Sequence, residues 1–157
     1  LGRMRPKTVR VVAVVAAHFF NDIVEMDVFY VRWNGKKRRI LTIMDEFSRF
    51  ALDAAVKDEK AETECRALER YWIRWAGAPK VLRVDSSGGH MSQFMKNWCE
   101  LRGIRLSIVP RGAHHTLAFV ERHHQVRREQ LAIYKKDHPS DKLKTALTWL
   151  GWRMAAL

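Results

Sequence analysis

The stretch EMDVFYVRWNGKKRRILTIM, residues 25–44, decides the fold of this chain. Residues 25–33 are rich in Val, Phe, Tyr and Trp, which favour β-strands. Asn34-Gly35 follows directly and is a strong signal for a two-residue hairpin turn. Residues 38–44 then supply a second strand, so the sequence predicts an antiparallel hairpin near the start of the domain.

The rest of the chain alternates strand and helix patterns. A third strand is expected at residues 50–56, before an amphipathic helix at 60–76 whose apolar positions recur every three or four residues. The later elements are expected as strand, helix, strand, helix and helix at residues 81–84, 92–102, 104–109, 117–136 and 138–157. This order predicts an α/β fold with a five-stranded mixed sheet, three antiparallel strands followed by two parallel ones, flanked by helices.

The composition favours a single domain that binds a polyanion. At 157 residues and 47% hydrophobic, the chain can bury a core, and a formal net charge of +12 favours nucleic acid as partner. A membrane is not expected as a partner, because no apolar run approaches the roughly 20 residues that span a bilayer. Residues 1–19 form a basic leader, and the start at Leu1 resembles a piece cut from a longer polyprotein.

The two cysteines, Cys65 and Cys99, show no spacing with each other or with histidines that would suit a zinc site. Reduced thiols in an intracellular protein are therefore expected.

Three acidic residues stand out from the pattern of strands and helices. Asp27 lies inside an apolar strand, Asp85 ends the fourth strand before a Ser/Gly turn, and Glu121 falls in the first turns of the long helix. Each has an ordinary explanation by itself: a buried ion pair, a turn or cap residue, and an acid favoured by the helix dipole. Their order is more informative, because it predicts that they meet at one end of the sheet, where ligand sites lie.

Such a cluster of carboxylates would require cations. Carboxylates about 4 Å apart repel by roughly 4 kcal/mol per pair at an effective dielectric of about 20. Oxygen ligands favour Mg²⁺ or Mn²⁺ over zinc, and two such ions support in-line displacement at a phosphodiester. We therefore expect Asp27, Asp85 and Glu121 to be the catalytic residues and the ligands of two ions, with no other cofactor.

With these residues identified, the sequence resembles the integrase catalytic core of retroviruses and long-terminal-repeat retrotransposons, over about residues 20–135. That family has two Asp and a Glu with 35 residues between the last two, and the same number separates Asp85 from Glu121. The other matching features are Met26-Asp27, Asp45 with Ser48-Arg49, Phe94, Cys99, Gly103-Ile104, Pro110 and Val120-Glu121-Arg122.

The resemblance implies a ribonuclease-H-like catalytic core at residues 20–137, followed by a C-terminal amphipathic helix at 138–157. It also implies an integrase and endonuclease that cleaves element DNA ends, joins them to target DNA and works as a dimer or higher oligomer. Its expected place is intracellular, in the nucleus or in an element nucleoprotein particle.

The chain departs from the family pattern at two loops. Residues 86–90 read SSGGH where the family usually has Asn-Gly and an acid, and residues 116–119 read TLAF where it usually has Asn-Gly. The family's zinc-binding and DNA-binding flanking domains are also not among these 157 residues. Two alternatives therefore stay open: a decayed or domesticated core that binds DNA or oligomerises without catalysis, and a ribonuclease-H-like nuclease.

Basic and histidine residues near Glu121 are the candidates for DNA contact. Helical spacing places His124, Gln125 and Arg128 on the face of Glu121. The predicted DNA-binding residues are His114, His115, Arg122, His124, Gln125 and Arg128. The wider basic set expected to contact phosphate is Arg102, Arg105, Arg111, Arg122, Arg127, Arg128, Lys135 and Lys136.

Other polar residues receive simpler interpretations. His90 and the pair His123-His124 are interpreted as DNA-contacting or surface histidines, because no acid is spaced with them. Asp45 is the rival for the first catalytic carboxylate, but turn formation explains it and Asp27 is preferred. The tryptophans at helical positions, expected in the core or in a dimer contact, are Trp72, Trp75, Trp98, Trp149 and Trp152.

Overall fold

A computed structural model describes residues 16–87, 89–110 and 117–155. Its five strands form one mixed sheet in the order β3-β2-β1-β4-β5. The first three strands pair antiparallel, and β4 and β5 join parallel to β1. The predicted sheet is therefore confirmed. The strands are β1 (Ile23–Trp33), β2 (Lys36–Asp45), β3 (Ala51–Val56), β4 (Val81–Asp85) and β5 (Arg105–Val109).

The β1–β2 hairpin turns at the dipeptide that the sequence singled out. Asn34 and Gly35 both have positive φ angles, of 51° and 72°. Two consecutive left-handed residues are what the tightest hairpin turn needs, and Asn and Gly tolerate this conformation best. The strands then pair from Trp33 opposite Lys36 onward, which fixes the face on which every later side chain of β1 lies.

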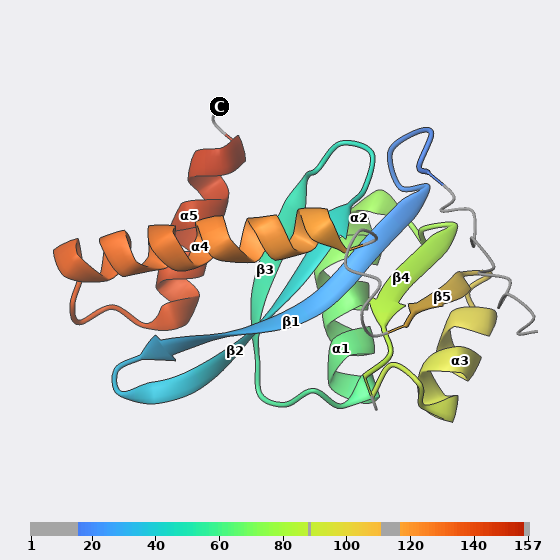
Figure 1. Ribbon diagram of the computed structural model, residues 1–157, viewed down its shortest axis with the longest axis horizontal. Helices are drawn as coiled ribbons and strands as arrows, with labels where there is room; N and C mark the ends of the chain where they lie inside the picture. The colour runs from blue at the N-terminus through green and yellow to red at the C-terminus, as the bar shows by residue number, and fades with distance from the viewer. Residues whose placement is uncertain (1–15, 88, 111–116, 156–157) are drawn as a thin grey trace, which may run out of the picture.

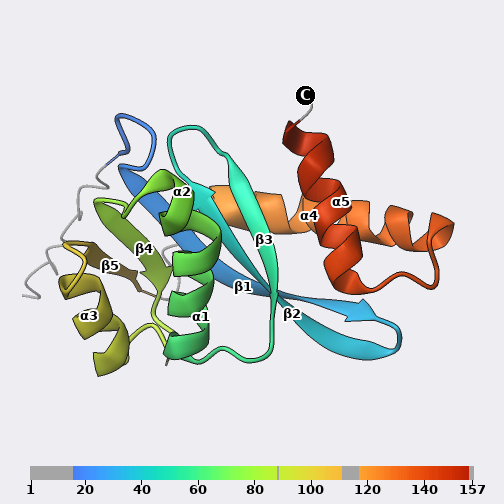
Figure 2. The ribbon, with the colours of Figure 1, turned by 180° about the vertical axis from the view of Figure 1, so that it is seen from behind.

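Helices cover both faces of the sheet. α1 and α3 pack on one face, whereas α4 crosses the other and α5 packs beside α4 and β3 (Figures 1 and 2). The predicted helix at 60–76 is one continuous helical run that contains a π-helical turn. The helical elements are α1 (Ala61–Leu68), the π-helical turn η1 (Glu69–Ile73), α2 (Arg74–Ala76), α3 (Gln93–Glu100), α4 (Ala118–Asp137) and α5 (Leu143–Ala155).

Two apolar clusters hold the layers together. Under α1 and α3, the sheet residues Val24 and Met26 pack with the fully buried Trp72, and both cysteines lie there as free thiols. Under α4 and α5, Phe29 packs on the opposite face of β1. The core position expected for the tryptophans holds for Trp72, whereas Trp75 is 55% exposed. Among the described residues, no helix has the length and apolar character needed to cross a bilayer.

Candidate active site

The sheet brings Asp27 and Asp85 onto neighbouring strands. β1 and β4 run parallel, and Met26 is paired with Val84, so the next residue on each strand is one of the two acids. Because side chains alternate along a strand, Asp27 shares the face of Phe29, the face that α4 covers. Glu121 lies in the first turn of α4, which begins over this part of the sheet (Figure 1).

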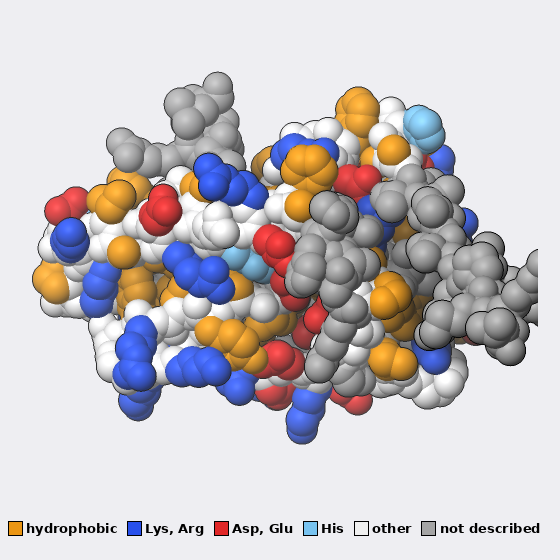
Figure 3. Space-filling view, in the orientation of Figure 1, with side chains coloured by type: hydrophobic (Ala, Val, Ile, Leu, Met, Phe, Trp, Pro, Cys, Tyr) orange, Lys and Arg blue, Asp and Glu red, His pale blue; other side chains and the backbone are white. Residues whose placement is uncertain are grey.

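The charges of the three acids act on one another. Burial, together with the negative charges of Asp85 and Glu121, raises the pKa of Asp27 to about 6. Asp85 and Glu121 are therefore close enough to Asp27 for their charges to raise its pKa. Figure 3 shows Asp and Glu side chains gathered near the start of α4 on this face.

The donor set fits a hard divalent cation in its chemistry, although the side chains are not closed around a common point. Within the described residues, no three His, Cys, Asp or Glu side chains are arranged to hold an ion as they stand. Two facts still favour Mg²⁺ or Mn²⁺: every donor is a carboxylate oxygen, and the negative charges disfavour one another. Small movements of the side chains would have to complete the coordination.

Asp85 is held by the turn that follows it. His90 Nδ1 lies 2.6 Å from Oδ1 of Asp85, and the backbone N–H of Ser87 donates to the same oxygen at 3.1 Å. Burial would raise the pKa of Asp85, but these hydrogen bonds outweigh it and lower the pKa. The second ring nitrogen of His90, Nε2, lies 2.7 Å from Oε2 of Glu64, at ion-pair distance but out of line for a straight hydrogen bond.

His90 was misjudged from the sequence as a surface or DNA-contacting residue. It is 2% exposed, and its acidic neighbours are Asp85 and, from α1, the buried Glu64. Burial would lower the pKa of His90, but the two carboxylates raise it to about 9. Glu64 precedes His90 by a helix and a strand, so no local spacing could have shown this contact.

His124 was also predicted to contact DNA, and its placement is at odds with that role. It is 5% exposed and stacks on Phe29 with ring centroids 4.4 Å apart. Its Nδ1 lies 3.7 Å from Oδ2 of Asp27, and burial lowers the pKa of His124 to about 4. The loop histidines His114 and His115 lie outside the described residues.

Arg127, expected to contact phosphate, instead forms part of a buried network beneath α4. Its Nε donates to Asp53 of β3 at 2.5 Å, and His123 Nε2 lies 2.9 Å from the same oxygen. Thr42 of β2 donates to the other Asp53 oxygen at 2.6 Å. Arg127 and Asp53 are almost fully buried, so the phosphate role expected for Arg127 is wrong and the residue anchors the helix.

The other predicted DNA contacts are available to a ligand. Arg122, Gln125 and Arg128 are all exposed on α4. Arg128 is steadied by a 3.2 Å hydrogen bond from its Nε to the carbonyl oxygen of Tyr30. Lys and Arg side chains continue from α4 onto the β1–β2 hairpin (Figure 3).

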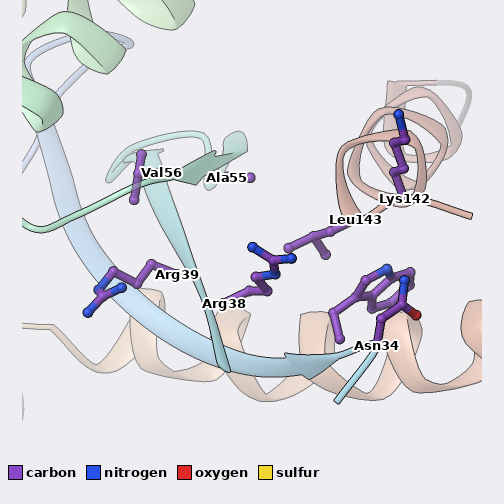
Figure 4. A pocket seen from close by; sticks show the side chains of 8 residues that line it. Asn34, Arg38, Arg39, Ala55, Val56, Lys142 and Leu143 are labelled. Atoms are coloured by element: carbon purple, nitrogen blue, oxygen red, sulfur yellow. The ribbon is translucent and has the colours of Figure 1, made fainter. Parts of the chain in front are cut away.

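Two basic hollows lie at the hairpin end of the molecule, away from the acids. One, of about 390 Å³, is lined by Trp33, Asn34, Arg38, Arg39, Ala55, Val56, Lys142 and Leu143 (Figure 4). The other, of about 450 Å³, is lined by Tyr30, Val31, Arg32, Trp33, Arg128, Leu131, Ala132 and Lys135. Their cations suit phosphate groups, whereas neither hollow contains the carboxylates expected to carry out chemistry.

Asp45, the rival for the first catalytic carboxylate, is held by hydrogen bonds in and beside its turn. It accepts hydrogen bonds from the backbone N–H of Asn21 at 2.8 Å and from Ser48, whose N–H and hydroxyl lie at 2.7 and 2.6 Å. These contacts explain its complete burial, and the preference for Asp27 stands.

Comparison with known sequences identifies related proteins. A family model described as the integrase core domain matches residues 18–114. A protein of insertion element IS407 from Burkholderia multivorans, described as an uncharacterised 31.7 kDa protein, is 29% identical over 89 residues. The match covers 56% of this chain and 32% of that protein, so the chain spans about a third of the length of this relative.

Solved structures with the same fold come from retroviruses. The simian T-cell lymphotropic virus intasome in complex with PP2A regulatory subunit B56 gamma matches with a TM-score of 0.83 and 21% identity, over 88% of this chain and 50% of that chain. The HTLV-2 integrase catalytic core domain in complex with magnesium, in its dimeric form, matches with a TM-score of 0.76 and 22% identity, over 86% of both chains. The BIV integrase catalytic core gives 0.66 and 20%, over 82% of this chain and 79% of that one. These likenesses show a shared ribonuclease-H-like fold.

Proposed function

The chain belongs to the integrase core domain family, and on this basis we propose that it is a polynucleotidyl transferase core that cleaves element DNA ends and joins them to target DNA. Asp27, Asp85 and Glu121 are the proposed catalytic residues. The observation that carries the proposal is that the parallel strands β1 and β4 bring Asp27 next to Asp85 on the face where α4 begins with Glu121. The charges of both other acids raise the pKa of Asp27, which agrees with this placement.

The three carboxylates would hold two Mg²⁺ or Mn²⁺ ions. When bound, such ions supply activation of the attacking oxygen and stabilisation of the leaving oxygen in an in-line displacement at phosphorus. The magnesium in the structure of the HTLV-2 core, a protein of the same fold, supports this choice of ion.

The protein holds in place the elements that carry the proposed ligands. The backbone N–H of Val28 donates to Oδ1 of Asp27 at 2.9 Å, which fixes the plane of this carboxylate in the middle of a central strand. Glu121 stands on a helix that Arg127 and His123 tie to Asp53. Ligands on anchored strands and helices lose little freedom when they bind an ion or substrate.

DNA would lie along α4 and the β1–β2 hairpin. Arg122, Gln125 and Arg128 are exposed beside Glu121, and the basic hollow that contains Arg128 continues to Arg32 and Lys135. Contacts of this kind fix the position of the backbone without reading sequence. They would place a phosphodiester next to the acids.

The second candidate function is a core that binds DNA without cutting it. It is favoured by the altered turn after Asp85, where His90 engages one carboxylate oxygen, and by the carboxylates not being closed around a common point. Under this alternative DNA binding persists, metal titration shows no site, and loss of Glu121 changes nothing.

The test is a divalent-metal-dependent nicking and strand-transfer assay with labelled element-end DNA. We expect Glu121→Gln to abolish both products, whereas Glu129→Gln, an exposed acid two turns further along α4, should leave them unchanged. Products in the Glu121→Gln variant would refute the catalytic role. Labelled RNA–DNA hybrids in the same assay separate an integrase from a ribonuclease-H-like nuclease.

The biological setting follows from the same proposal. An integrase of a retrotransposon would work in the nucleus or in the element's nucleoprotein particle, bound to element ends and target DNA, and as a dimer or higher oligomer. The HTLV-2 core is known in dimeric and trimeric forms, which supports self-association.

A further inference from the structure

We propose that His90, fixed by Glu64, is a positioning residue that orients the carboxylate of Asp85 for binding a divalent ion. This inference rests on the proposed function. It assigns a task to the turn SSGGH, residues 86–90, which the sequence alone marked only as a departure from the family pattern.

The geometry of the three side chains carries the inference. His90 Nδ1 is 2.6 Å from Oδ1 of Asp85, and Nε2 is 2.7 Å from Oε2 of Glu64. Glu64 and His90 are almost completely buried. The carboxylate of Glu64 and the imidazole of His90 are costly to desolvate. Their pairing beside the partly exposed Asp85 therefore points to a role other than packing.

The contacts act selectively on one oxygen of Asp85. His90 and the backbone N–H of Ser87 both engage Oδ1, and Ser87 Oγ lies 2.8 Å from Nδ1 of the same ring. Among the contacts of the described residues, none involves Oδ2. The carboxylate plane is therefore fixed, with Oδ2 left to face a ligand.

The backbone is shaped to bring His90 against α1. A Cβ atom added at Gly89 would lie 2.6 Å from the carbonyl oxygen of Glu59, which is closer than real Cβ contacts. Only glycine allows the turn to approach the start of α1 this closely. The close approach places the next residue, His90, within reach of Glu64, one turn into that helix.

The placement of His90 against Asp85 predicts the size of its effect on metal binding. Residues that orient metal ligands typically change metal affinity by about 10–100-fold when they are replaced. We expect an effect of this size from His90.

The test measures Mn²⁺ dissociation constants by electron paramagnetic resonance for the wild-type protein, His90→Asn, Glu64→Gln and the double variant. We expect about a 10–100-fold weaker affinity for His90→Asn and a smaller loss for Glu64→Gln. The double variant should be no weaker than His90→Asn, because Glu64 acts through His90. The exposed His18→Asn is the matched control, and circular dichroism melts in EDTA establish that each variant is folded.

A metal-free readout separates this inference from the proposed function. In protein labelled with ¹⁵N-histidine and without metal, the ring nitrogens of His90 should give NMR signals that shift in Glu64→Gln and in Asp85→Asn. Failure of wild-type protein to bind Mn²⁺ overturns the proposed function, and the ring signals then still decide whether His90 orients Asp85. Absence of those shifts, or folded His90→Asn protein with wild-type Mn²⁺ affinity, overturns the inference.

Discussion

Two aspartates lie beneath the same helix, Asp53 almost fully buried and Asp27 partly buried, and their surroundings shift their pKa values in opposite directions. Burial would raise the pKa of Asp53, but His123, Arg127 and Thr42 outweigh it and lower the pKa. Burial and the nearby charge of Asp85 together raise the pKa of Asp27 to about 6. The fold therefore neutralises one carboxylate and leaves the other without a strong cationic partner of its own.

The comparison separates a structural carboxylate, Asp53, from the proposed functional carboxylate, Asp27. The Asp53 network fastens α4 to β2 and β3, so the helix that carries Glu121 is fixed. The charges of Asp85 and Glu121 raise the pKa of Asp27 instead, and a positively charged partner from outside the chain would offset this effect. A divalent ion is the simplest such partner for a set of carboxylates.

The largest effect on activity should come from removing the charge of one of the proposed catalytic acids, Asp27, Asp85 and Glu121, which form the functional set. We expect Asp27→Asn to lower strand-transfer rates at least about 1,000-fold, which corresponds to about 4 kcal/mol of lost transition-state stabilisation. Asp58→Asn, at an exposed loop, is the control. A loss smaller than tenfold in a steady-state assay would move Asp27 out of the catalytic set.

Replacing Asp53, the centre of the network that holds α4, should lower the free energy of unfolding. We expect Asp53→Asn to destabilise the fold by about 3–5 kcal/mol, because it removes the buried carboxylate that pairs with the buried charge of Arg127. Urea unfolding at pH 7 measures the change. A loss below about 1 kcal/mol would mean that the network does not anchor α4.

Asp53 should also affect how the stability of the fold depends on pH. The pKa of Asp53 is lowered in the folded state, so its contribution to stability is present above the ordinary value of 3.8 and is lost as the pH falls through the folded value. In urea titrations between about pH 5 and pH 2, Asp53→Asn should therefore lose less stability than the wild type. Parallel curves for the two proteins would contradict this assignment.

Replacing Asp27 should change the stability of the fold in the opposite direction. Because the pKa of Asp27 is raised, its cost to folding is absent below 3.8 and fully present above about 6. We expect Asp27→Asn to stabilise metal-free protein at pH 8 by on the order of 1–3 kcal/mol. Added Mn²⁺ should raise the melting temperature of the wild type and leave the variant unchanged; equal responses would argue against an ion at this site.

The smallest effects should come from the exposed cations of α4. Arg128→Ala and Arg122→Ala should each reduce the slope of log affinity against log salt by about 1, since each removes one phosphate contact. Arg66→Ala, on the helix that covers the other face of the sheet, should leave the slope unchanged. Fluorescence anisotropy with duplex DNA measures the slopes.

The sheet, and the placement of Asp27 and Asp85 on neighbouring strands, could be predicted because local signals determine them. The Asn34-Gly35 turn fixes the hairpin register, and strand alternation then places Asp27 on the face that α4 covers. Contacts between distant segments could not be predicted. Glu64 and His90 meet only because the turn after β4 packs against α1, and no spacing in the sequence encodes that distance.

The burial of two α4 residues could have been found in the sequence. The buried residues of this helix are Val120, His124, Arg127, Leu131 and Tyr134, spaced three or four apart. Counting only apolar residues hid this stripe, because His124 and Arg127 occupy its middle. A basic residue on an apolar stripe predicts a buried acid as its partner, and Asp53 is that acid.

The most direct test of the functional set is to locate Mn²⁺ by anomalous diffraction in crystals soaked with the ion. We predict a peak within coordination distance of the carboxylates of Asp27 and Asp85, adjacent to Glu121, that is missing in Asp27→Asn crystals. Saturating Mn²⁺ with no peak at these residues, or side chains of the three acids that point apart, would contradict the proposed metal-binding site.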